Sequence, residues 1–420
     1  MKRSRFILTL ISIMLVLAIS LQLTGCMTAS AQSLMVGIEP EEVSPNEDMT
    51  GGNAALTDFA VRLLRTSTAG GDEVLISPLS VICALAMTMN GAEGETLAEM
   101  EGVLGLSKDE LNSYLYTYLN RLPKSEKYKI SVANSIWFTD DERFCVNNSF
   151  LQSNANYYSA EIYKTPFNRS TLRDINRWVK DETDGMIPKI IESIPEEAVM
   201  YLVNALAFEA TWESTYKENQ VRNGTFTTED GTTENVKMMY DTVSRYLEDG
   251  YATGFIRYYK QRRYAFVAML PNEGVSLAEY ISTLDGESLY ETLSNPSHET
   301  VKTAIPKFDG EYSADLSEML KSLGMTSAFD PDFAEFGGVG TYDVDGNVYI
   351  SKVLHKTFIS ISERGTRAGA ATVVEMGGNA AGGPPEEPKI VYLDRPFVYM
   401  LIDCETNTPF FIGTTMSVKN

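Results

Sequence analysis

The side chains that most often perform enzymatic chemistry are scarce in this chain. Histidine occurs only at His298 and His355, which excludes or strains His-based catalytic triads and His-rich metal sites. No Gly-Lys-Ser/Thr phosphate loop, Gly-x-Ser-x-Gly elbow or His-Glu-x-x-His motif is present. Carboxylate pairs could act alone, but 57 Asp and Glu residues make such pairs uninformative without geometry. We expect no metal or other cofactor. Of the functions considered for this chain, hydrolase is the least favoured.

One segment has an unusual composition for the interior of a domain. Residues 363–396 are rich in Ala, Gly, Thr and Val and end in a Pro- and Glu-rich stretch. A long segment with little structure of its own inside a compact domain is usually functional. The alternative is a disordered surface insertion, and the order of residues inside the segment argues against it.

The first half of this segment is suited to join a β-sheet. In a strand, every second residue from Thr366 to Met376 would share one small, uncharged face, and both charges of the stretch would lie on the other face. Insertion is possible up to about Ala381. Beyond it the chain has three prolines, which lack the N–H that an interior strand must donate: Pro384, Pro385 and Pro388.

The rest of the chain provides the elements that must hold this segment. Helical periodicity is visible at 54–66, from Ser77 to about Met89 and at 174–180. Short β-prone runs dominate later: Val199–Phe208, Tyr264–Leu270, Val301–Phe308, Val348–Ser362 and Phe397–Ile402. No linker divides residues 53–420, so we expect one α+β domain.

The N-terminus has the features of a sorting signal. A basic start and an apolar run to Leu21 lead to Leu23-Thr24-Gly25-Cys26, which resembles a bacterial lipobox. This predicts a signal peptide over 1–25 and a lipidated Cys26 that anchors a secreted protein to the outer face of a membrane. The alternative is a signal or anchor helix with an incidental cysteine. Residues 26–52 are expected to form a flexible tether.

Charge and cysteine content exclude further classes. The net charge of -22 argues against nucleic-acid binding, which requires an excess of Lys and Arg. The other cysteines are Cys83, Cys145 and Cys404, which are widely spaced and form neither a disulfide framework nor a metal motif.

Several motifs, in order along the chain, resemble one family. Glu363-Arg364-Gly365-Thr366 with Ala368-Gly369-Ala370-Ala371-Thr372 resembles the reactive-loop hinge of the inhibitory serpins. Similar agreement is found in four further segments: Ile76–Ser80, Asn176–Val179, Leu202–Ala205 and Ile305–Phe308. Arg395–Tyr399 and Pro409–Gly413 resemble the family's closing strands.

The resemblance implies a fold and a mechanism. The fold would have three β-sheets with a layer of helices and an exposed reactive-centre loop at about 363–390. A serine or cysteine protease would cut this loop, and the cut loop would insert into the main sheet and trap the acyl-enzyme. We expect a monomeric inhibitor rather than an enzyme. The alternative is a non-inhibitory serpin that acts as a surface binding or chaperone-like module.

The resemblance also assigns roles to single residues. The hinge would comprise Glu363, Gly365, Thr366, Ala368, Gly369, Ala370, Ala371 and Thr372. A hydrogen-bonded shutter beneath the sheet would comprise Ser77, Ser80, Asn204 and His355. The breach, where insertion begins, would contain Trp212 and Lys307, the latter paired with Glu363.

The scissile bond follows from counting. In the family the hinge Glu is the seventeenth residue before the cut, which places the bond between Asn379 and Ala380. Met376, Gly378 and Ala380 remain alternatives, because the segment is longer than is typical. Small residues around the bond favour a subtilisin-, elastase- or papain-like target protease.

Overall fold

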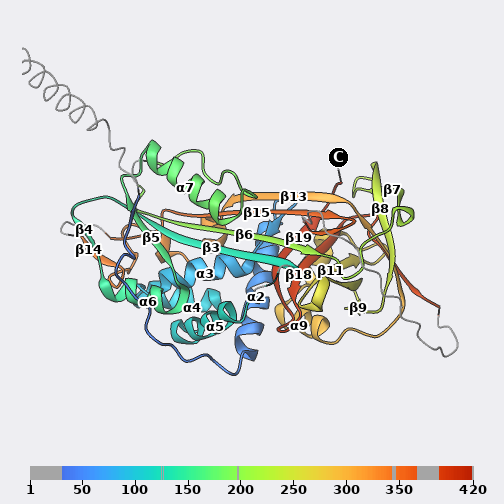
Figure 1. Ribbon diagram of the computed structural model, residues 1–420, viewed down its shortest axis with the longest axis horizontal. Helices are drawn as coiled ribbons and strands as arrows, with labels where there is room; N and C mark the ends of the chain where they lie inside the picture. Colours follow the sequence, from blue (N-terminus) through green and yellow to red (C-terminus); the bar gives the residue numbers. More distant parts are fainter. Residues whose placement is uncertain are drawn as a thin grey trace, which may run out of the picture.

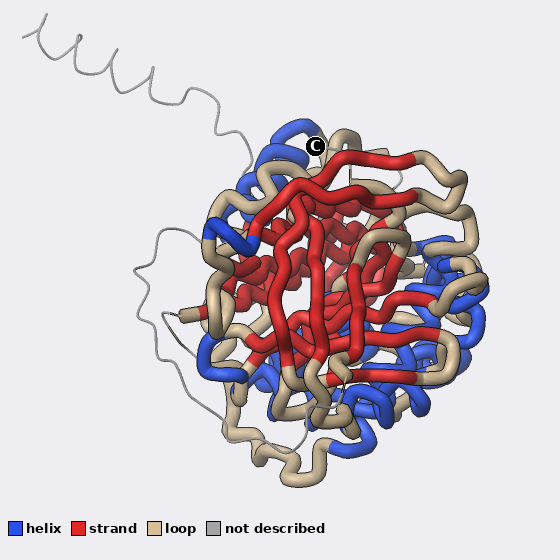
Figure 2. Tube along the Cα trace, turned by 90° about the vertical axis from the view of Figure 1, so that its right-hand side faces the viewer, coloured by secondary structure: helices blue, strands red, loops and turns tan. Residues whose placement is uncertain are grey.

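The computed structural model describes residues 31–123, 125, 127–195, 198–342, 347–366 and 387–418. These residues form three main β-sheets with helices packed around them, as Figures 1 and 2 show. The α+β class expected from the sequence is confirmed.

The largest sheet carries the features on which function depends. Its strand order is β1-β5-β3-β6-β16-β15-β13. The strands are β1 (Gln32–Ser33), β5 (Glu161–Thr165), β3 (Tyr128–Thr139), β6 (Met200–Thr211), β16 (Gly365–Thr366), β15 (Lys352–Ser362) and β13 (Phe308–Asp315). We call it the main sheet.

Two smaller sheets complete the β-structure around it. The second comprises β2 (Leu75–Ile76), β19 (Thr408–Thr415), β18 (Phe397–Asp403), β11 (Tyr264–Pro271), β10 (Ala252–Tyr258) and β9 (Tyr246–Glu248). The third comprises β17 (Lys389–Tyr392), β12 (Val301–Pro306), β8 (Thr233–Val243) and β7 (Val221–Thr227). A separate pair joins β4 (Phe144–Val146) and β14 (Gly340–Tyr342).

Helices cover both faces of the main sheet. The α-helices are α2 (Thr50–Ser67), α3 (Pro78–Met89), α4 (Gly94–Leu104), α5 (Lys108–Asn120), α6 (Asn148–Tyr158), α7 (Arg169–Glu182), α8 (Leu277–Thr283), α9 (Gly286–Ser294) and α10 (Ser317–Ser322). Short 3-10 turns are η1 (Glu218–Gln220), η2 (Lys260–Arg262) and η3 (Ser327–Phe329). In Figure 1, α7 lies on one face of the sheet and α3, α5 and α6 lie on the other.

Strand alternation on β6 explains this arrangement. Successive side chains of a strand point to opposite faces, and β6 is buried on both. Tyr201, Val203 and Ala205 join the core cluster beneath α7, whereas Leu202 and Leu206 join the larger core that includes α3. Helix α3 begins at Pro78 after the N-cap Ser77 and is buried along its whole length.

The N-terminal segment differs from its prediction. The sequence predicts a loose tether over 26–52, but residues 31–48 lie against the domain. Strand β1 pairs with β5, and the Ala31 N–H donates to Asp174 Oδ2 at 3.3 Å. Leu34, Met35 and Ile38 pack against the core. These apolar residues, scattered among polar ones, give the segment a partly buried side, and the edge of β5 offers it hydrogen bonds.

Candidate functional site

The centre of the main sheet is closed at one end and parted at the other. Strands β6 and β15 pair in parallel from Tyr201 opposite Lys352 to Leu206 opposite Thr357. Beyond that point they separate, and β16 lies between them, antiparallel to both. Thr366 faces Ala210 on one side and Ile361 on the other. The sheet therefore already holds the first two residues of an additional strand.

Gly365 fits this gap because it has no side chain. Its φ is +148°, in the region that favours glycine. A Cβ on Gly365 would lie 2.0 Å from the Ala210 carbonyl oxygen and 2.8 Å from Thr211 Cα. Thr366 follows with its side chain buried, and its Oγ1 lies 2.5 Å from Tyr259 Oη. The position of the hinge thus depends on the close backbone approach that Gly365 allows and on the buried hydroxyl of Thr366.

Trp212 holds the turn that leads from β15 into β16. Its indole stacks on the Tyr259 ring, with centroids 4.4 Å apart and planes 7° apart. The indole Nε1–H donates to the Ser362 carbonyl oxygen at 2.8 Å, and the Trp212 backbone N–H donates to the Arg364 carbonyl oxygen at 2.9 Å. The structure therefore places the predicted breach tryptophan directly against the hinge.

The predicted ion pair at the loop base is present. Lys307 Nζ lies 2.6 Å from Glu363 Oε2, and this hydrogen bond holds the pKa of Glu363 below its usual value. Both side chains are more than a third exposed. Such a pair contributes at most about 1 kcal/mol to stability. Its main effect is therefore to orient the Glu363 side chain at the base of the loop.

The four predicted shutter residues meet below the parted end. Ser77, Ser80, Asn204 and His355 are all inaccessible to solvent. His355 Nδ1 lies 2.5 Å from Asn204 Oδ1, which also accepts from Ser80 Oγ at 3.2 Å. The Ser77 backbone N–H donates to His355 Nε2 at 3.2 Å. These bonds are made with Nε2 as acceptor and Nδ1–H as donor, so His355 is neutral.

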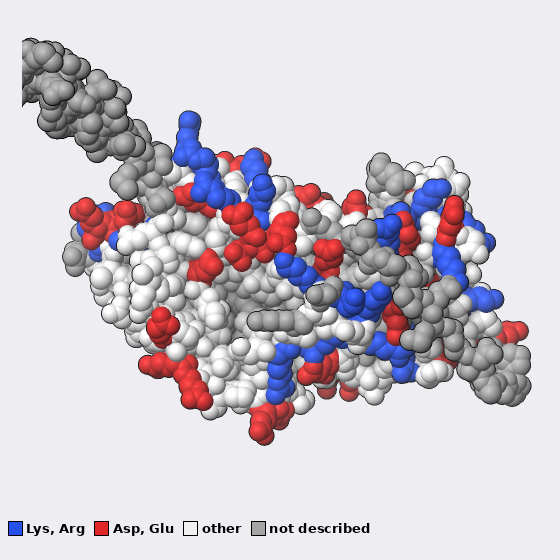
Figure 3. Space-filling model, in the orientation of Figure 1, with Lys and Arg blue, Asp and Glu red and all other residues white. Residues whose placement is uncertain are grey.

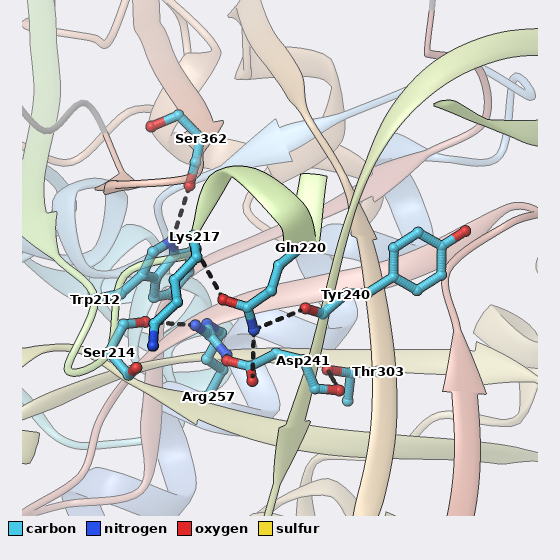
Figure 4. Close-up of polar contacts among 9 residues, drawn as sticks. All are labelled: Trp212, Ser214, Lys217, Gln220, Tyr240, Asp241, Arg257, Thr303 and Ser362. Carbon is cyan, nitrogen blue, oxygen red and sulfur yellow. Dashed lines mark hydrogen bonds and ion pairs between the residues drawn. The ribbon is translucent and has the colours of Figure 1, made fainter. Parts of the chain in front are cut away.

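A buried arginine behind the breach was not predicted from the sequence. Arg257, on β10, is 5% exposed and donates to Asp241 Oδ2 at 2.7 Å and to the Ser214 carbonyl oxygen at 2.6 Å (Figure 4). Its guanidinium lies over the rings of Trp212 and Tyr216, at 5.1 and 4.1 Å from their centroids. The Tyr216 N–H in turn donates to the Glu363 carbonyl oxygen. Arg257 thus supports both residues that grip the hinge.

Polar contacts extend this support to the third sheet. Gln220 Nε2 donates to Asp241 Oδ1 and to the Tyr240 carbonyl oxygen, both at 3.2 Å (Figure 4). Thr303 Oγ1 donates to the Asp241 carbonyl oxygen at 3.2 Å. The sequence signal for this network is weak: one arginine inside the apolar run that precedes Tyr258.

Some predicted residues lie outside the described part of the chain. They are the later hinge residues Ala368, Gly369, Ala370, Ala371 and Thr372, the expected scissile pair Asn379 and Ala380, and the expected lipidation site Cys26. Among the described residues, no group of His, Cys, Asp or Glu side chains is arranged to hold a metal ion. No described helix combines the length and apolar character needed to cross a membrane.

Comparison with known proteins agrees with this geometry. A family model described as serpin (serine protease inhibitor) matches residues 54–418. An uncharacterized serpin-like protein of Thermococcus kodakarensis is 32% identical over 375 residues, covering 87% of this chain and 85% of that protein. Human neuroserpin is 27% identical over 381 residues, covering 86% and 90%.

Solved structures give the same result. The crystal structure of the thermophilic serpin tengpin in the native state has a TM-score of 0.87 and 45% sequence identity, and covers 93% of this chain and 100% of that chain. The latent state of tengpin has a TM-score of 0.77 and 43% identity, and covers 90% and 100%.

We expect Gly365→Val to expel β16 from the gap, because its Cβ would collide with the Ala210 carbonyl oxygen. Amide hydrogen exchange in peptides covering 207–212 and 358–366 should then accelerate. Gly102→Ala is the matched control, since a Cβ there meets nothing within 4 Å. Unchanged exchange in Gly365→Val would mean that the close approach does not hold the hinge.

We expect His355 to make stability depend on pH. Burial lowers the pKa of His355 to about 3, and the unfolded chain has a value near about 6.5. Between these two pKa values the unfolded state therefore binds more protons than the folded state. The contribution of His355 to the free energy of unfolding is constant above about pH 6.5 and falls as the pH drops toward 3. At pH 5 the loss is about 2 kcal/mol.

Urea unfolding at pH 7 and pH 5 tests this dependence, with His355→Gln as the comparison. The Asp403 carboxyl, whose pKa burial raises to about 6, acts in the opposite sense in both proteins. The difference in pH dependence therefore isolates His355. Equal losses in the two proteins would exclude it as the source.

We expect Arg257→Met to lower the free energy of unfolding by about 2–3 kcal/mol, because the substitution leaves the partly buried Asp241 without its cation. Trp212 fluorescence should change, since the guanidinium lies over its ring. Arg262→Met is the matched control: its ion pair with Glu213 is exposed and is worth at most about 1 kcal/mol. Equal effects of the two substitutions in urea unfolding would contradict the supporting role.

Proposed function

The chain belongs to the serpin family, whose members are generally protease inhibitors rather than enzymes, and from this premise we propose that it is an irreversible suicide-substrate inhibitor of a serine protease. A cysteine protease would be trapped in the same way. The protease attacks the reactive loop and forms an acyl-enzyme. The cut loop then continues β16 into the main sheet and carries the protease with it before deacylation.

The observation that carries this proposal is the register of β16. Thr366 faces Ala210 and Ile361 in an antiparallel arrangement. Each further hinge residue that enters the sheet would therefore lie opposite the preceding residue of β6 and the preceding residue of β15. Ala371 would come to lie opposite Ala205. Met376 would lie opposite Met200, where β6 begins. The part of the segment with one small, uncharged face, Thr366 to Met376, thus matches the length of β6, and the predicted limit of insertion near Ala381 lies beyond the start of that strand.

The same register explains how the shutter acts. Thr372 would enter between Asn204 and His355, which now face each other in the parallel pairing of β6 and β15. Their side-chain hydrogen bond, at 2.5 Å, must break for the strand to pass. The bond between His355 and Asn204 would therefore oppose insertion. Once it is broken, the hydroxyl of Thr372 could form a hydrogen bond with either side chain.

Insertion would release a large free energy. About ten residues would gain backbone hydrogen bonds to the strands on both sides, and each bond contributes a net of about 0.5–1.5 kcal/mol. The loss of the β6–β15 pairing offsets part of this gain. The gain is on the order of 10 kcal/mol, comparable with the whole stability of a typical domain. The native fold would then be a kinetic trap, and insertion would be irreversible.

The pairing of β6 with β15 supports assignment of this conformation to the uninserted form. The similarity to tengpin is greater for its native state than for its latent state, with TM-scores of 0.87 and 0.77. The loop would thus be available as bait.

Target and location extend this proposal. Small residues at the expected bond, Asn379–Ala380, favour a subtilisin-, elastase- or papain-like protease. Lipidation of Cys26 would hold the inhibitor on the outer face of a bacterial membrane, where it could intercept proteases that reach the cell surface.

A second candidate is a non-inhibitory serpin that binds a partner without trapping it. Such a protein would not need small residues in the hinge. The alanines and glycines from Ala368 to Ala371, together with the β16 already placed in the sheet, favour inhibition.

The test is to incubate the chain with subtilisin-, elastase-, trypsin- and papain-like proteases and to examine the products on denaturing gels and by mass spectrometry. We expect a protease-sized covalent adduct and a released C-terminal peptide that begins at Ala380. Thr366→Arg should be cut without forming the adduct, because a charge cannot occupy the buried position beside Tyr259.

Cleavage of the wild-type chain by every protease, without an adduct and without a gain in melting temperature, would show that the loop does not insert. The non-inhibitory alternative would then be adopted.

A further inference from the structure

A cavity opens at the breach, beside the hinge. Its volume is about 580 Å³, which lies in the range of small-molecule sites. It is lined mainly by residues that follow β6, by the Lys307–Glu363 pair and by Arg364.

The charge of this cavity is opposite to that of the chain. Four cations line it, namely Lys217, Lys237, Lys307 and Arg364, against two carboxylates, Glu218 and Glu363. The local balance is thus positive, although the net charge of the chain is -22. In Figure 3, blue Lys and Arg side chains lie among red Asp and Glu side chains on the half of the molecule that carries this end of the main sheet, and another blue group lies over α7 at the other end.

The cations come from both sides of the parted sheet. Lys217 follows β6 and lies beside Trp212 and Gln220 in Figure 4. Lys307 stands between β12 and β13, and its backbone N–H donates to the Lys237 carbonyl oxygen on β8 at 2.8 Å. Arg364 lies in the turn between β15 and β16. A ligand in the cavity would therefore touch the β6 side and the β15 side together.

We propose that this cavity, which we call the breach anion site, binds a small phosphate-bearing anion with at least two negative charges. Three of the four cations are lysines, which bind phosphate as point charges, and the guanidinium of Arg364 can bind an oxyanion through two parallel N–H groups. Lys307 already pairs with Glu363, and Lys237 Nζ already donates to Asn223 Oδ1 at 2.6 Å. A singly charged anion would compete poorly with these partners, whereas a multivalent one can share all four cations.

The consequence for inhibition rests on the proposed function. Insertion requires the β6 half of the sheet to move away from β15. An anion that joins Lys217 to Lys307 and Arg364 resists this movement. The bound form therefore keeps its native conformation longer and inserts its cut loop more slowly.

The binding test uses the full chain and inorganic pyrophosphate, with chloride at matched ionic strength as the salt control. We expect saturable binding by calorimetry and a rise of several degrees in melting temperature. Lys217→Gln/Lys237→Gln should lower the affinity at least fivefold. Lys302→Gln, an exposed lysine of β12 outside the cavity, should leave it unchanged. No saturable binding, or equal affinity in the double variant, would overturn the site.

A second arm measures the rate of covalent adduct formation with and without saturating pyrophosphate. We expect the rate to fall at least threefold in the wild type and to stay constant in Lys217→Gln/Lys237→Gln. An unchanged wild-type rate would overturn the regulatory role. The binding arm uses no protease, so a failure of the proposed function, seen as no adduct in the anion-free sample, is distinguished from a failure of the site.

Discussion

The structure depends on an incomplete contact between two strands. β6 and β15 are paired over six residues and then separate, and in the described part of the chain the two residues of β16 lie between them at the separated end. A sheet normally completes its ladder, because unpaired backbone groups are costly to bury. Here six backbone residue pairs, together with the side-chain hydrogen bond between His355 and Asn204, close the lower part, and β16 lies between the two strands in the upper part.

Residues of three sheets are joined at the parted end. Trp212 belongs to the segment that continues β6, Tyr259 follows β10, and their rings stack in close contact. Arg257 joins this stack to Asp241 on β8 of the third sheet. The hinge is therefore anchored by contacts that reach all three sheets.

The sequence predicted the parts of this arrangement that depend on local composition. The alternating small residues from Thr366 predicted which side chain would be buried. The buried polar cluster of Ser77, Ser80, Asn204 and His355 was predicted only through the resemblance to the serpins, not from local composition. Arg257 could not be predicted, because a lone arginine in an apolar run does not reveal its carboxylate partner on another sheet. The packing of residues 31–48 was missed for a similar reason: its hydrogen-bond partners, such as Asp174 and Thr117, are distant in the sequence.

The position of β1 determines how the fold responds to mechanical force. β1 is the edge strand of the main sheet on the β6 side, and it is joined to β5 by two residue pairs. A pull on the N-terminus would therefore load these pairs first and peel them one after another, at low force. The load would not reach β6 and β15 while the segment up to Asn46 was still detaching. β1 would thus detach before the strands at the centre of the main sheet are loaded.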